Sequence, residues 1–239
     1  MNVIDKTKIK GILFDSGYVL VYPTGANNWF ISPKFFEIIN NKDITLNDLN
    51  KGFSNASDIL STDLAIYNRE EEIECFKKFY TKAFKSLNLD VSDNDIESLA
   101  IDISDNPEKY AFYEDSKPAL EMLEKKFKLA LVSDAWPSMR KIYEYNNMDK
   151  YFDTLVISSE LATLKPDKLM YRTAMDVLEL KPEECIFLDD NINNCIGAKK
   201  IGITPILVSR NHEDYVKNMK QYKDYINIEN LQELIELIY

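Results

Sequence analysis

Residues 185–200 read CIFLDDNINNCIGAKK, an apolar run that ends in two adjacent carboxylates and continues into a helical pattern. The run Cys185 to Leu188 predicts a buried strand, and Asn193 to Lys200 predicts the helix that follows it. Similar apolar runs recur at residues 9–14, 129–132, 154–157 and 204–208. Strands that alternate with helices at this spacing are typical of a parallel sheet covered on both faces. The sequence therefore predicts a doubly wound α/β fold.

Helical periodicity fills most of the remaining chain. It predicts helices at residues 117–127, 137–145 and 167–178, and the apolar spacing over residues 229–239 predicts an amphipathic helix that packs on the core. Between about Pro23 and Pro107 no comparable strand run occurs, so we assign residues 23–107 to an inserted all-helical cap. Residues 1–22 and 108–239 then form the α/β core. Because the insertion begins just past the carboxyl end of the first strand, where open α/β sheets bind ligands, we expect it to act as a lid.

Composition excludes several classes of function. The chain has 239 residues and a net charge of −11, which disfavours general binding to nucleic acids or anionic membranes. No apolar run approaches the ~18 residues of a membrane span, and the first residues lack a signal-peptide pattern. Three cysteines without a CxxC pair indicate a reducing compartment and no structural zinc site. We expect a soluble, cytoplasmic protein, and the sequence gives no indication of its oligomeric state.

The chain has one histidine, His212, and this argues against several kinds of active site. A Ser-His-Asp triad, an HExxH zinc site and a histidine-ligated iron each need histidine in a specific context. His212 lies in Asn-His-Glu-Asp, away from other reactive residues, so we expect it in a surface loop. The lysine- and tyrosine-containing stretch 215–225 also carries acidic residues. It predicts a solvated surface helix and not a nucleic-acid stripe.

Two strand ends carry reactive side chains. Asp15 follows the apolar run Ile12-Leu13-Phe14, so its carboxylate is expected at the rim of the sheet, where it can act as a nucleophile or a metal ligand. Gly17 lets the backbone turn sharply, so that its carbonyl can face the same point. Ser133 ends a second strand with a hydroxyl that can donate to a phosphate oxygen.

The second half of the chain adds a cation and a pair of acids. Lys165 stands directly before Pro166, which can occupy the first turn of a helix, and its ammonium can neutralise a phosphate and an attacking carboxylate together. Asp189 and Asp190 end a strand, with Asn194 after them. Two adjacent carboxylates repel unless a cation or hydrogen-bond donors compensate, and such hard oxygen ligands suit Mg²⁺.

In order and spacing these four features resemble the motifs of the haloacid dehalogenase (HAD) superfamily of phosphotransferases. Asp15 matches its first motif, Ser133 the second, Lys165 the third and Asp189-Asp190 the fourth. The resemblance runs from about Lys8 to Tyr239, and the helical insertion is similar to the type-1 cap of that family.

The resemblance implies a phosphoric monoester hydrolase that acts in two steps on a small phosphorylated metabolite. Asp15 would attack phosphorus to form an aspartyl-phosphate, which water then hydrolyses. Mg²⁺ would be held by the Asp15 carboxylate, the backbone carbonyl of Gly17 and Asp190, with Asp189 behind or in place of Asp190. Ser133 and Lys165 would hold the phosphoryl oxygens.

The sequence departs from the family pattern at two positions. Most phosphatases of the family have an Asp two residues after the nucleophile, which protonates the leaving oxygen and then activates water, whereas this chain has Gly17. Some capped members with a Phe-Asp-x-Gly-x-Val pattern resemble this chain and are phosphatases, including of sugar phosphates. Asp134 replaces the usual Asn after the second-motif serine, and its carboxylate would repel a bound phosphate unless it is turned away.

Two other functions remain open. A haloacid dehalogenase-type hydrolase would use the same aspartate to attack carbon without Mg²⁺, although it has no use for the cation site at Asp189-Asp190. A degenerate member would bind a phosphorylated ligand or a partner without turnover. Substrate choice is expected to depend on the cap, where the candidate contacts are Tyr22, Asn27, Asn28 and Trp29. Trp136 could line the pocket floor or cover the sheet.

Overall fold

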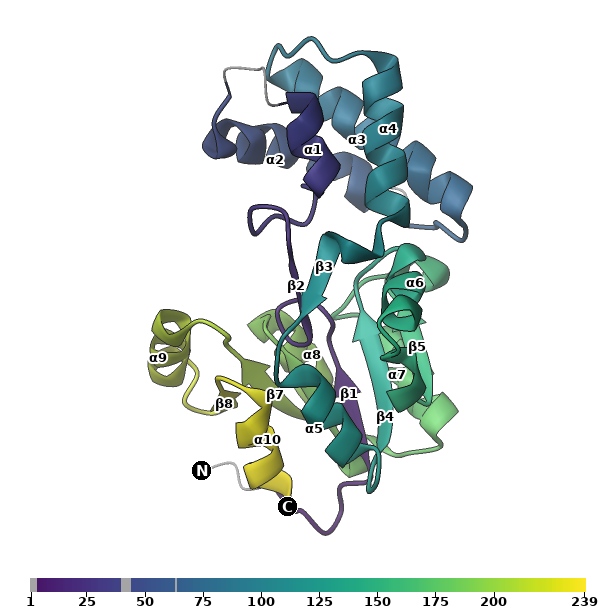
Figure 1. Cartoon of the computed structure of the whole chain (residues 1–239). Helices are drawn as coiled ribbons and strands as arrows, with labels where there is room; N and C mark the ends of the chain where they lie inside the picture. The colour runs from purple at the N-terminus through teal and green to yellow at the C-terminus, as the bar shows by residue number, and fades with distance from the viewer. Residues whose placement is uncertain (1–3, 40–43, 63) are drawn as a thin grey trace.

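The computed structural model describes residues 4–39, 44–62 and 64–239. Its centre is a six-stranded parallel sheet (Figure 1). The strands are β1 (Gly11–Phe14), β4 (Lys128–Ser133), β5 (Thr154–Ile157), β6 (Cys185–Asp189), β7 (Thr204–Val208) and β8 (Ile226–Ile228), in the order β5-β4-β1-β6-β7-β8. The predicted doubly wound α/β fold is confirmed. The five predicted strands are all present, and β8 is an additional, short edge strand.

Helices cover both faces of the sheet. One face packs against α5 (Ser116–Leu123), α6 (Ser138–Tyr145) and α10 (Leu231–Ile238), and the other against α7 (Lys168–Leu178) and α8 (Ile192–Lys200). Successive strand residues alternate between the two faces: in β1, Ile12 and Phe14 join the first cluster, while Leu13 joins the second. Because both faces are buried, the strands are continuous apolar runs in the sequence.

The strand order reverses at β1. The chain passes from β1 to β4 and β5 on one side, and β6, β7 and β8 lie on the other side. Phe14 is in register with Leu131 of β4 and with Leu188 of β6, so all three strands end at the same edge. This reversal opens a crevice at the carboxyl ends of the central strands, which is where such sheets bind ligands.

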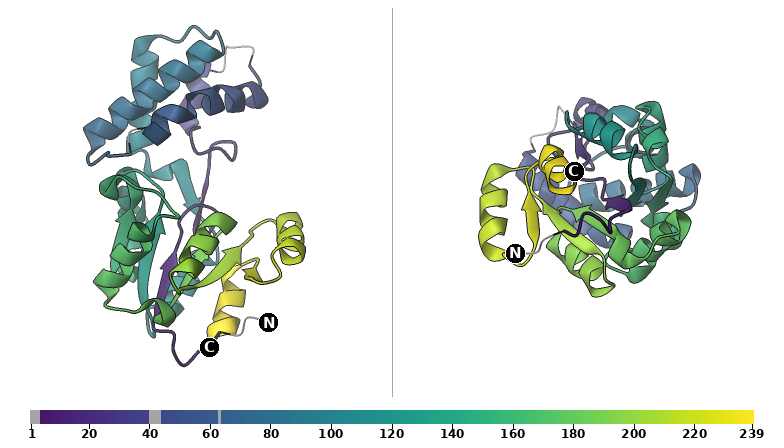
Figure 2. Two further views of the ribbon diagram at one scale, coloured as in Figure 1. Left: turned by 180° about the vertical axis from the view of Figure 1, so that it is seen from behind. Right: turned by 90° about the horizontal axis from the view of Figure 1, so that it is seen from below.

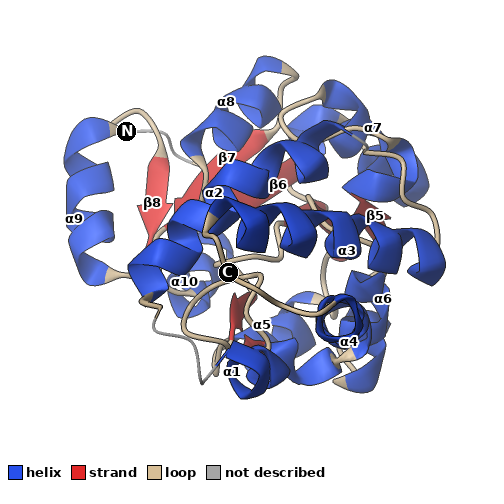
Figure 3. Ribbon diagram, turned by 90° about the horizontal axis from the view of Figure 1, so that it is seen from above, coloured by secondary structure: helices blue, strands red, loops and turns tan. Residues whose placement is uncertain are grey.

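A separate group of helices lies above that edge (Figures 1 and 2). They are α1 (Pro33–Ile39), α2 (Leu46–Thr62), α3 (Arg69–Ser86) and α4 (Asp93–Asp105), and we call them the four-helix unit. Asn68 and Ser92 cap α3 and α4 with side-chain oxygens that accept backbone N–H groups. The unit has a hydrophobic cluster of its own, rich in aromatic residues. Viewed from above, α2 and α3 cross over the end of the sheet (Figure 3).

Two short strands connect the four-helix unit to the rest of the chain. β2 (Val21–Pro23) and β3 (Tyr110–Phe112) pair antiparallel, and the 3-10 helix η1 (Pro107–Lys109) precedes β3. The chain thus leaves and returns through one two-stranded ribbon, directly beside the crevice. The remaining elements are α9 (His212–Gln221), η2 (Asp149–Tyr151), η3 (Ser158–Leu161) and η4 (Pro182–Glu184).

Some local predictions were wrong in detail. His212 is exposed, but it begins helix α9, because the Asn211 side chain accepts from the N–H groups of Glu213 and Asp214 and so caps that helix. Pro166 lies in the turn before α7, whose N-cap is Asp167. Within the described residues, no helix combines the length and the apolar character needed to cross a membrane.

Candidate active site

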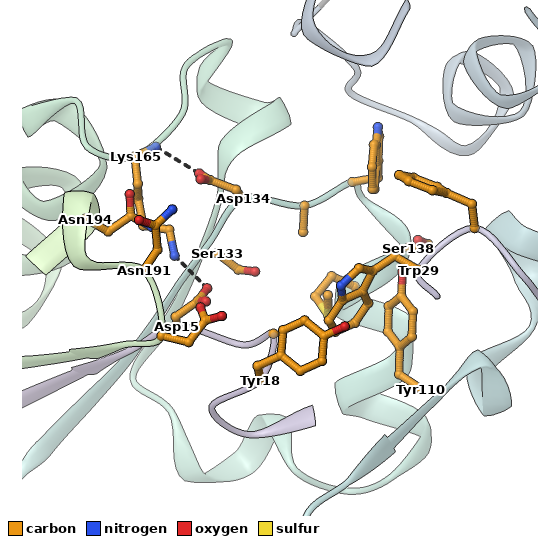
Figure 4. Close-up of a pocket in the computed structure, with 16 residues that line it drawn as sticks. Asp15, Tyr18, Trp29, Tyr110, Ser133, Asp134, Ser138, Lys165, Asn191 and Asn194 are labelled. Atoms are coloured by element: carbon orange, nitrogen blue, oxygen red, sulfur yellow. Dashed lines mark hydrogen bonds and ion pairs between the residues drawn. The ribbon is translucent and has the colours of Figure 1, made fainter. Parts of the chain in front are cut away.

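The four predicted motifs meet at the crevice beside β1 (Figure 4). Asp15 directly follows β1, and its backbone N–H donates to the carbonyl of Leu188 in β6 at 2.8 Å, which continues the strand pairing by one residue. Ser133 is the last residue of β4. Both side chains line a cavity of about 350 Å³ together with the other sequence-predicted residues Gly17, Asp134, Trp136, Lys165 and Asp190.

Lys165 is the electrostatic centre of the site. Its Nζ lies 2.6 Å from Oδ1 of Asp15 and 2.8 Å from Oδ2 of Asp189, and its side chain is 1% exposed. Burial lowers the pKa of Lys165, but the nearby carboxylates, Asp15 first, outweigh it and hold the pKa above its ordinary value. The ammonium therefore stays charged and offsets part of the negative charge around it.

Asp189 is buried and accepts hydrogen bonds from several donors. Besides Lys165, it accepts from the backbone N–H of Asn191 at 2.8 Å and from Nδ2 of Asn194 at 3.1 and 3.0 Å. Its side chain is 0% exposed and does not line the cavity. These contacts orient Lys165 toward Asp15, so Asp189 holds the lysine in place from behind.

The carboxylates can hold a divalent cation. Asp15, Asp189 and Asp190 offer ligand atoms within 4.8 Å of one another. Burial raises the pKa of Asp15 well above its ordinary value, and burial together with repulsion by Asp189 raises the pKa of Asp190 to about 7. Three carboxylates against one ammonium leave two negative charges in excess when all are ionised. An all-oxygen donor set with that excess suits a hard divalent cation such as Mg²⁺.

Asp134 is turned away from the centre of the site. Its Oδ1 accepts the backbone N–H of Lys165 at 2.9 Å, so the carboxylate fixes the loop that carries the lysine. Burial raises the pKa of Asp134. The repulsion that the sequence suggested is therefore reduced by orientation, and the side-chain oxygen makes a hydrogen bond that an Asn oxygen could also make.

Gly17 leaves room for a neighbouring side chain and does not adopt a left-handed backbone conformation. The left-handed residue of this turn is Tyr18, with φ of 50°, which corrects the expectation that Gly17 makes the turn. A Cβ at position 17 would lie 3.2 Å from Cζ2 of Trp29. The indole of Trp29 thus occupies the space beside Gly17, next to Tyr18 (Figure 4).

Aromatic side chains form the wall of the cavity that faces the four-helix unit. Trp136 lines the cavity, and it also packs against the four-helix unit through Phe76 of α3, with ring centroids 4.9 Å apart. Of the cap residues suggested as substrate contacts, Trp29 lines the cavity. Tyr22, Asn27 and Asn28 do not; Tyr22 packs on Tyr113, for example, with ring centroids 4.9 Å apart.

Sequence reasoning missed several lining residues. They are Tyr18, Phe30, Tyr110, Ala135, Ser138, Met139 and Asn191. Tyr110 follows the insertion, and Ser138 and Met139 begin α6, so none of them stands in a motif. Tyr18, Ala135 and Asn191 directly follow Gly17, Asp134 and Asp190, so their positions in the sequence could have suggested them.

Close packing behind the site holds the loop that carries Lys165 in place. A Cβ at Gly197 of α8 would lie 2.4 Å from Cβ of Pro166, so only glycine allows this approach. The hydroxyl of Tyr171 donates to the carbonyl of Asn194 at 2.9 Å and ties α7 to α8. The loop with Lys165 is thereby held against the helix that carries Asn194.

Comparison with known proteins gives both phosphatases and dehalogenases. The chain is 26% identical to the pyrophosphatase PpaX of Halalkalibacterium halodurans over 177 residues, which cover 72% of this chain and 81% of the pyrophosphatase. A HAD phosphatase from Thermococcus onnurineus superimposes with a TM-score of 0.59 at 20% identity, covering 96% of this chain and 98% of the other. An L-2-haloacid dehalogenase from Xanthobacter autotrophicus with chloropropionic acid covalently bound has a TM-score of 0.70 at 15% identity, with coverage of 96% and 98%.

At these identities the structural likeness shows the fold alone, and the two solved structures differ in their named chemistry. The family itself follows from the sequence match, since residues 38–208 fit the model of the haloacid dehalogenase-like hydrolases. That stretch is more than half of the 239 residues and includes Ser133, Lys165, Asp189 and Asp190. The chain therefore belongs to the haloacid dehalogenase-like hydrolases.

Proposed function

We propose that the protein is a Mg²⁺-dependent phosphatase that hydrolyses a small phosphorylated metabolite through an aspartyl-phosphate on Asp15. The observation that carries this proposal is the juxtaposition of Asp15, Lys165 and the Asp189-Asp190 pair at the end of the central strands. It combines a nucleophile, a buried cation and a candidate site for a divalent cation. The sequence similarity to a pyrophosphatase supports chemistry at phosphorus.

In the first step the Asp15 carboxylate attacks phosphorus, and the bond to the leaving oxygen breaks. Lys165 and the Ser133 hydroxyl hold the phosphoryl oxygens. Bound Mg²⁺, held by the carboxylates of Asp15 and Asp190 and the carbonyl of Gly17, would supply positive charge where negative charge accumulates. In the second step water attacks the aspartyl-phosphate, which releases phosphate and restores Asp15.

Residues 23–107, which contain the four-helix unit, are proposed to act as the cap. Trp29 and Phe30 from this segment line the cavity, opposite Asp15 and Ser133 of the sheet. A substrate bound between them would be shielded from bulk water, which strengthens the electrostatic contacts to the phosphoryl group.

A dehalogenase-type reaction at carbon is the second candidate. It is favoured by Trp29 beside Gly17, because a departing halide needs no proton and the site offers no acid at position 17. The candidate cation site speaks against it, since a reaction at carbon has no use for the divalent cation that Asp15, Asp189 and Asp190 could hold.

The decisive experiment is p-nitrophenyl phosphate hydrolysis by the purified protein with and without Mg²⁺, beside Asp15→Asn. We expect turnover that needs both the metal and Asp15. Absence of turnover in folded protein would refute the phosphatase, and halide release from 2-haloacids would then establish the second candidate.

A further inference from the structure

The space where a leaving-group acid would stand is filled by an indole. A Cβ at position 17 would lie 3.2 and 3.3 Å from Cζ2 and Cη2 of Trp29. The indole is held edge-on against Tyr18 and Tyr110, with ring centroids 5.0 and 4.9 Å away. A side chain at position 17 would therefore be in tight contact with the indole, which would have to shift by a few tenths of an ångström to make room for it.

The other polar groups that line the cavity are poor substitutes. The phenols of Tyr18 and Tyr110 pack edge-on against Trp29, and a tyrosine, with an ordinary pKa of about 10, is a weak acid near neutral pH. The Ser138 hydroxyl accepts from Nζ of Lys109 at 2.9 Å, and serine hydroxyls are weaker acids still.

Each carboxyl group that lines the cavity is already engaged. Asp15 is the nucleophile, and Asp190 belongs to the candidate cation site. Asp134 uses Oδ1 to hold the Lys165 loop. Each of these carboxyl groups thus has another contact or role, and with Gly17 the site has no acid at that position to protonate a departing alkoxide, a contribution that is worth about 10²–10⁴-fold in rate.

The wall beyond the reacting centre is aromatic and carries no free cation. Among the residues that line the cavity, Lys165 is the only cationic side chain, and Asp15 and Asp189 hold its ammonium. The wall is made of Trp29, Phe30, Tyr110, Trp136 and Met139. A second phosphate or a carboxylate on the substrate would find no counter-charge there, whereas a flat, uncharged body can pack against the rings.

We propose, on the basis of the phosphatase function above, that the substrates are phosphate monoesters of acidic hydroxyl groups on planar, uncharged bodies, that is, aryl phosphates. Trp29 and Gly17 are the residues that set this selectivity. Asp15 attacks phosphorus, the P–O bond breaks, and its electron pair departs with the aryl oxygen as a phenolate that needs no proton from the protein. Water then cleaves the aspartyl-phosphate, so that one water yields the phenol and inorganic phosphate and Asp15 is regenerated.

The first test compares kcat/KM of the wild-type protein, with Mg²⁺, for p-nitrophenyl phosphate, phenyl phosphate, glycerol phosphate, glucose 6-phosphate and pyrophosphate. We expect kcat/KM to fall as the leaving oxygen becomes more basic. The two alkyl phosphates should be at least about 10²-fold below p-nitrophenyl phosphate, as expected where no general acid acts. Pyrophosphate should be no better than the alkyl esters.

A matched pair of double variants tests the role of Trp29 and Gly17 directly. Both double variants carry Trp29→Ala, which opens the space beside position 17. One also carries Gly17→Asp, which adds an acid. The other carries Gly17→Asn, which has nearly the same shape but no acidic proton. The ratio of kcat/KM for glycerol phosphate to that for p-nitrophenyl phosphate should rise at least about tenfold in the Asp variant relative to the Asn variant. Equal ratios in two folded variants would contradict the proposal.

The results of these assays distinguish a failure of the proposed aryl selectivity from a failure of the proposed phosphatase function. If p-nitrophenyl phosphate is hydrolysed and glycerol phosphate is hydrolysed within about tenfold as well, the phosphatase stands and aryl selectivity is wrong. If Asp134→Asn abolishes turnover of alkyl but not aryl phosphates, Asp134 is the missing acid, and the proposal is also wrong. If no phosphate ester is hydrolysed, both proposals fall.

Discussion

At the scale of single residues, the site depends on one buried lysine between two carboxylates. Lys165 contacts Asp15 at 2.6 Å and Asp189 at 2.8 Å, and all three side chains are almost completely buried. Burying charges is costly, and attraction at short range offsets that cost only while every partner is present. Removing the lysine leaves two carboxylates facing each other in a medium of low polarity.

Lys165→Met is therefore expected to abolish phosphatase activity and to lower the free energy of unfolding by about 3–5 kcal/mol, as when one partner of a buried ion pair is lost. Urea unfolding at pH 7 measures the change. Lys141→Met is the matched control, because Lys141 lies 3.5 Å from Asp105 with 52% of its side chain exposed. It should cost no more than about 1 kcal/mol. Equal effects of the two substitutions would show that the buried lysine has no special role.

Asp134 provides a second prediction at this scale. Its Oδ1 accepts the Lys165 backbone N–H at 2.9 Å, and an Asn oxygen can accept the same bond. Asp134→Asn should keep p-nitrophenyl phosphate turnover and lower KM, because one negative charge beside the phosphate is removed. Asp134→Ala should lose activity, because the Lys165 loop loses its anchor. A KM that is unchanged in the Asn variant would show that the Asp134 charge does not reach the substrate.

At the scale of elements, the four-helix unit is joined to the core by a buried polar contact. Helix α6 has no side-chain N-cap of its own, and Oε2 of Glu72, from α3, accepts the backbone N–H of Ser138 at its first turn at 2.9 Å. Buried Lys109 donates to the Ser138 hydroxyl and to the carbonyl of Ile103. A carboxylate at a helix N-terminus also interacts favourably with the helix dipole. Any opening of the unit away from α6 must break this contact.

The same contact should make stability depend on pH. Burial lowers the pKa of Lys109 to about 8, although Glu72 pulls in the opposite direction. Between about pH 8 and its unfolded pKa near 10.5, the unfolded chain holds a proton that the folded chain has released, so the contribution of Lys109 to the free energy of unfolding rises with pH. The free energy of unfolding of the wild type minus that of Lys109→Met should increase by up to about 3 kcal/mol over this interval. Urea unfolding at several pH values measures this difference. If it does not change with pH, Lys109 keeps an ordinary pKa.

At the scale of the whole molecule, segments far apart in sequence share one charge cluster. Asp15 follows β1, and Asp189 and Asp190 end β6, with their ligand atoms within 4.8 Å of one another. Only the folded chain brings these carboxylates together. A cation that binds there must therefore stabilise the folded state by mass action.

The melting temperature should rise with Mg²⁺ concentration, with a stabilisation of about 2.7 kcal/mol when the metal is at 100 times its dissociation constant. Asp190→Asn should remove most of this rise and, without Mg²⁺, should melt no lower than the wild type because repulsion is relieved. Glu236→Gln, an exposed change of equal charge on α10, is the control and should keep the rise. A Mg²⁺ response that survives in Asp190→Asn would place the cation elsewhere.

The sequence alone determined those parts of the architecture whose burial produces a recognisable pattern of apolar residues. The central strands are buried on both faces, so continuous apolar runs predicted five of them. Candidate reactive residues were predicted before any contact was known, at strand ends for Asp15, Ser133, Asp189 and Asp190 and directly before a proline for Lys165. Strand β8 was missed because it is three residues long and only Ile228 is fully buried. A short, half-exposed strand has no distinctive pattern.

The tertiary structure decided which side chains surround those ends. Periodicity reports that a residue is buried, but not what covers it, and the covering residues come from segments whose packing depends on the whole chain. Trp29 lies over Gly17 and Glu72 caps α6 only because the ribbon of β2 and β3 places the four-helix unit against the crevice. The sequence thus predicted the candidate reacting groups of this hydrolase. The folded structure decided which side chains surround them, because those neighbours come from segments far apart in the chain.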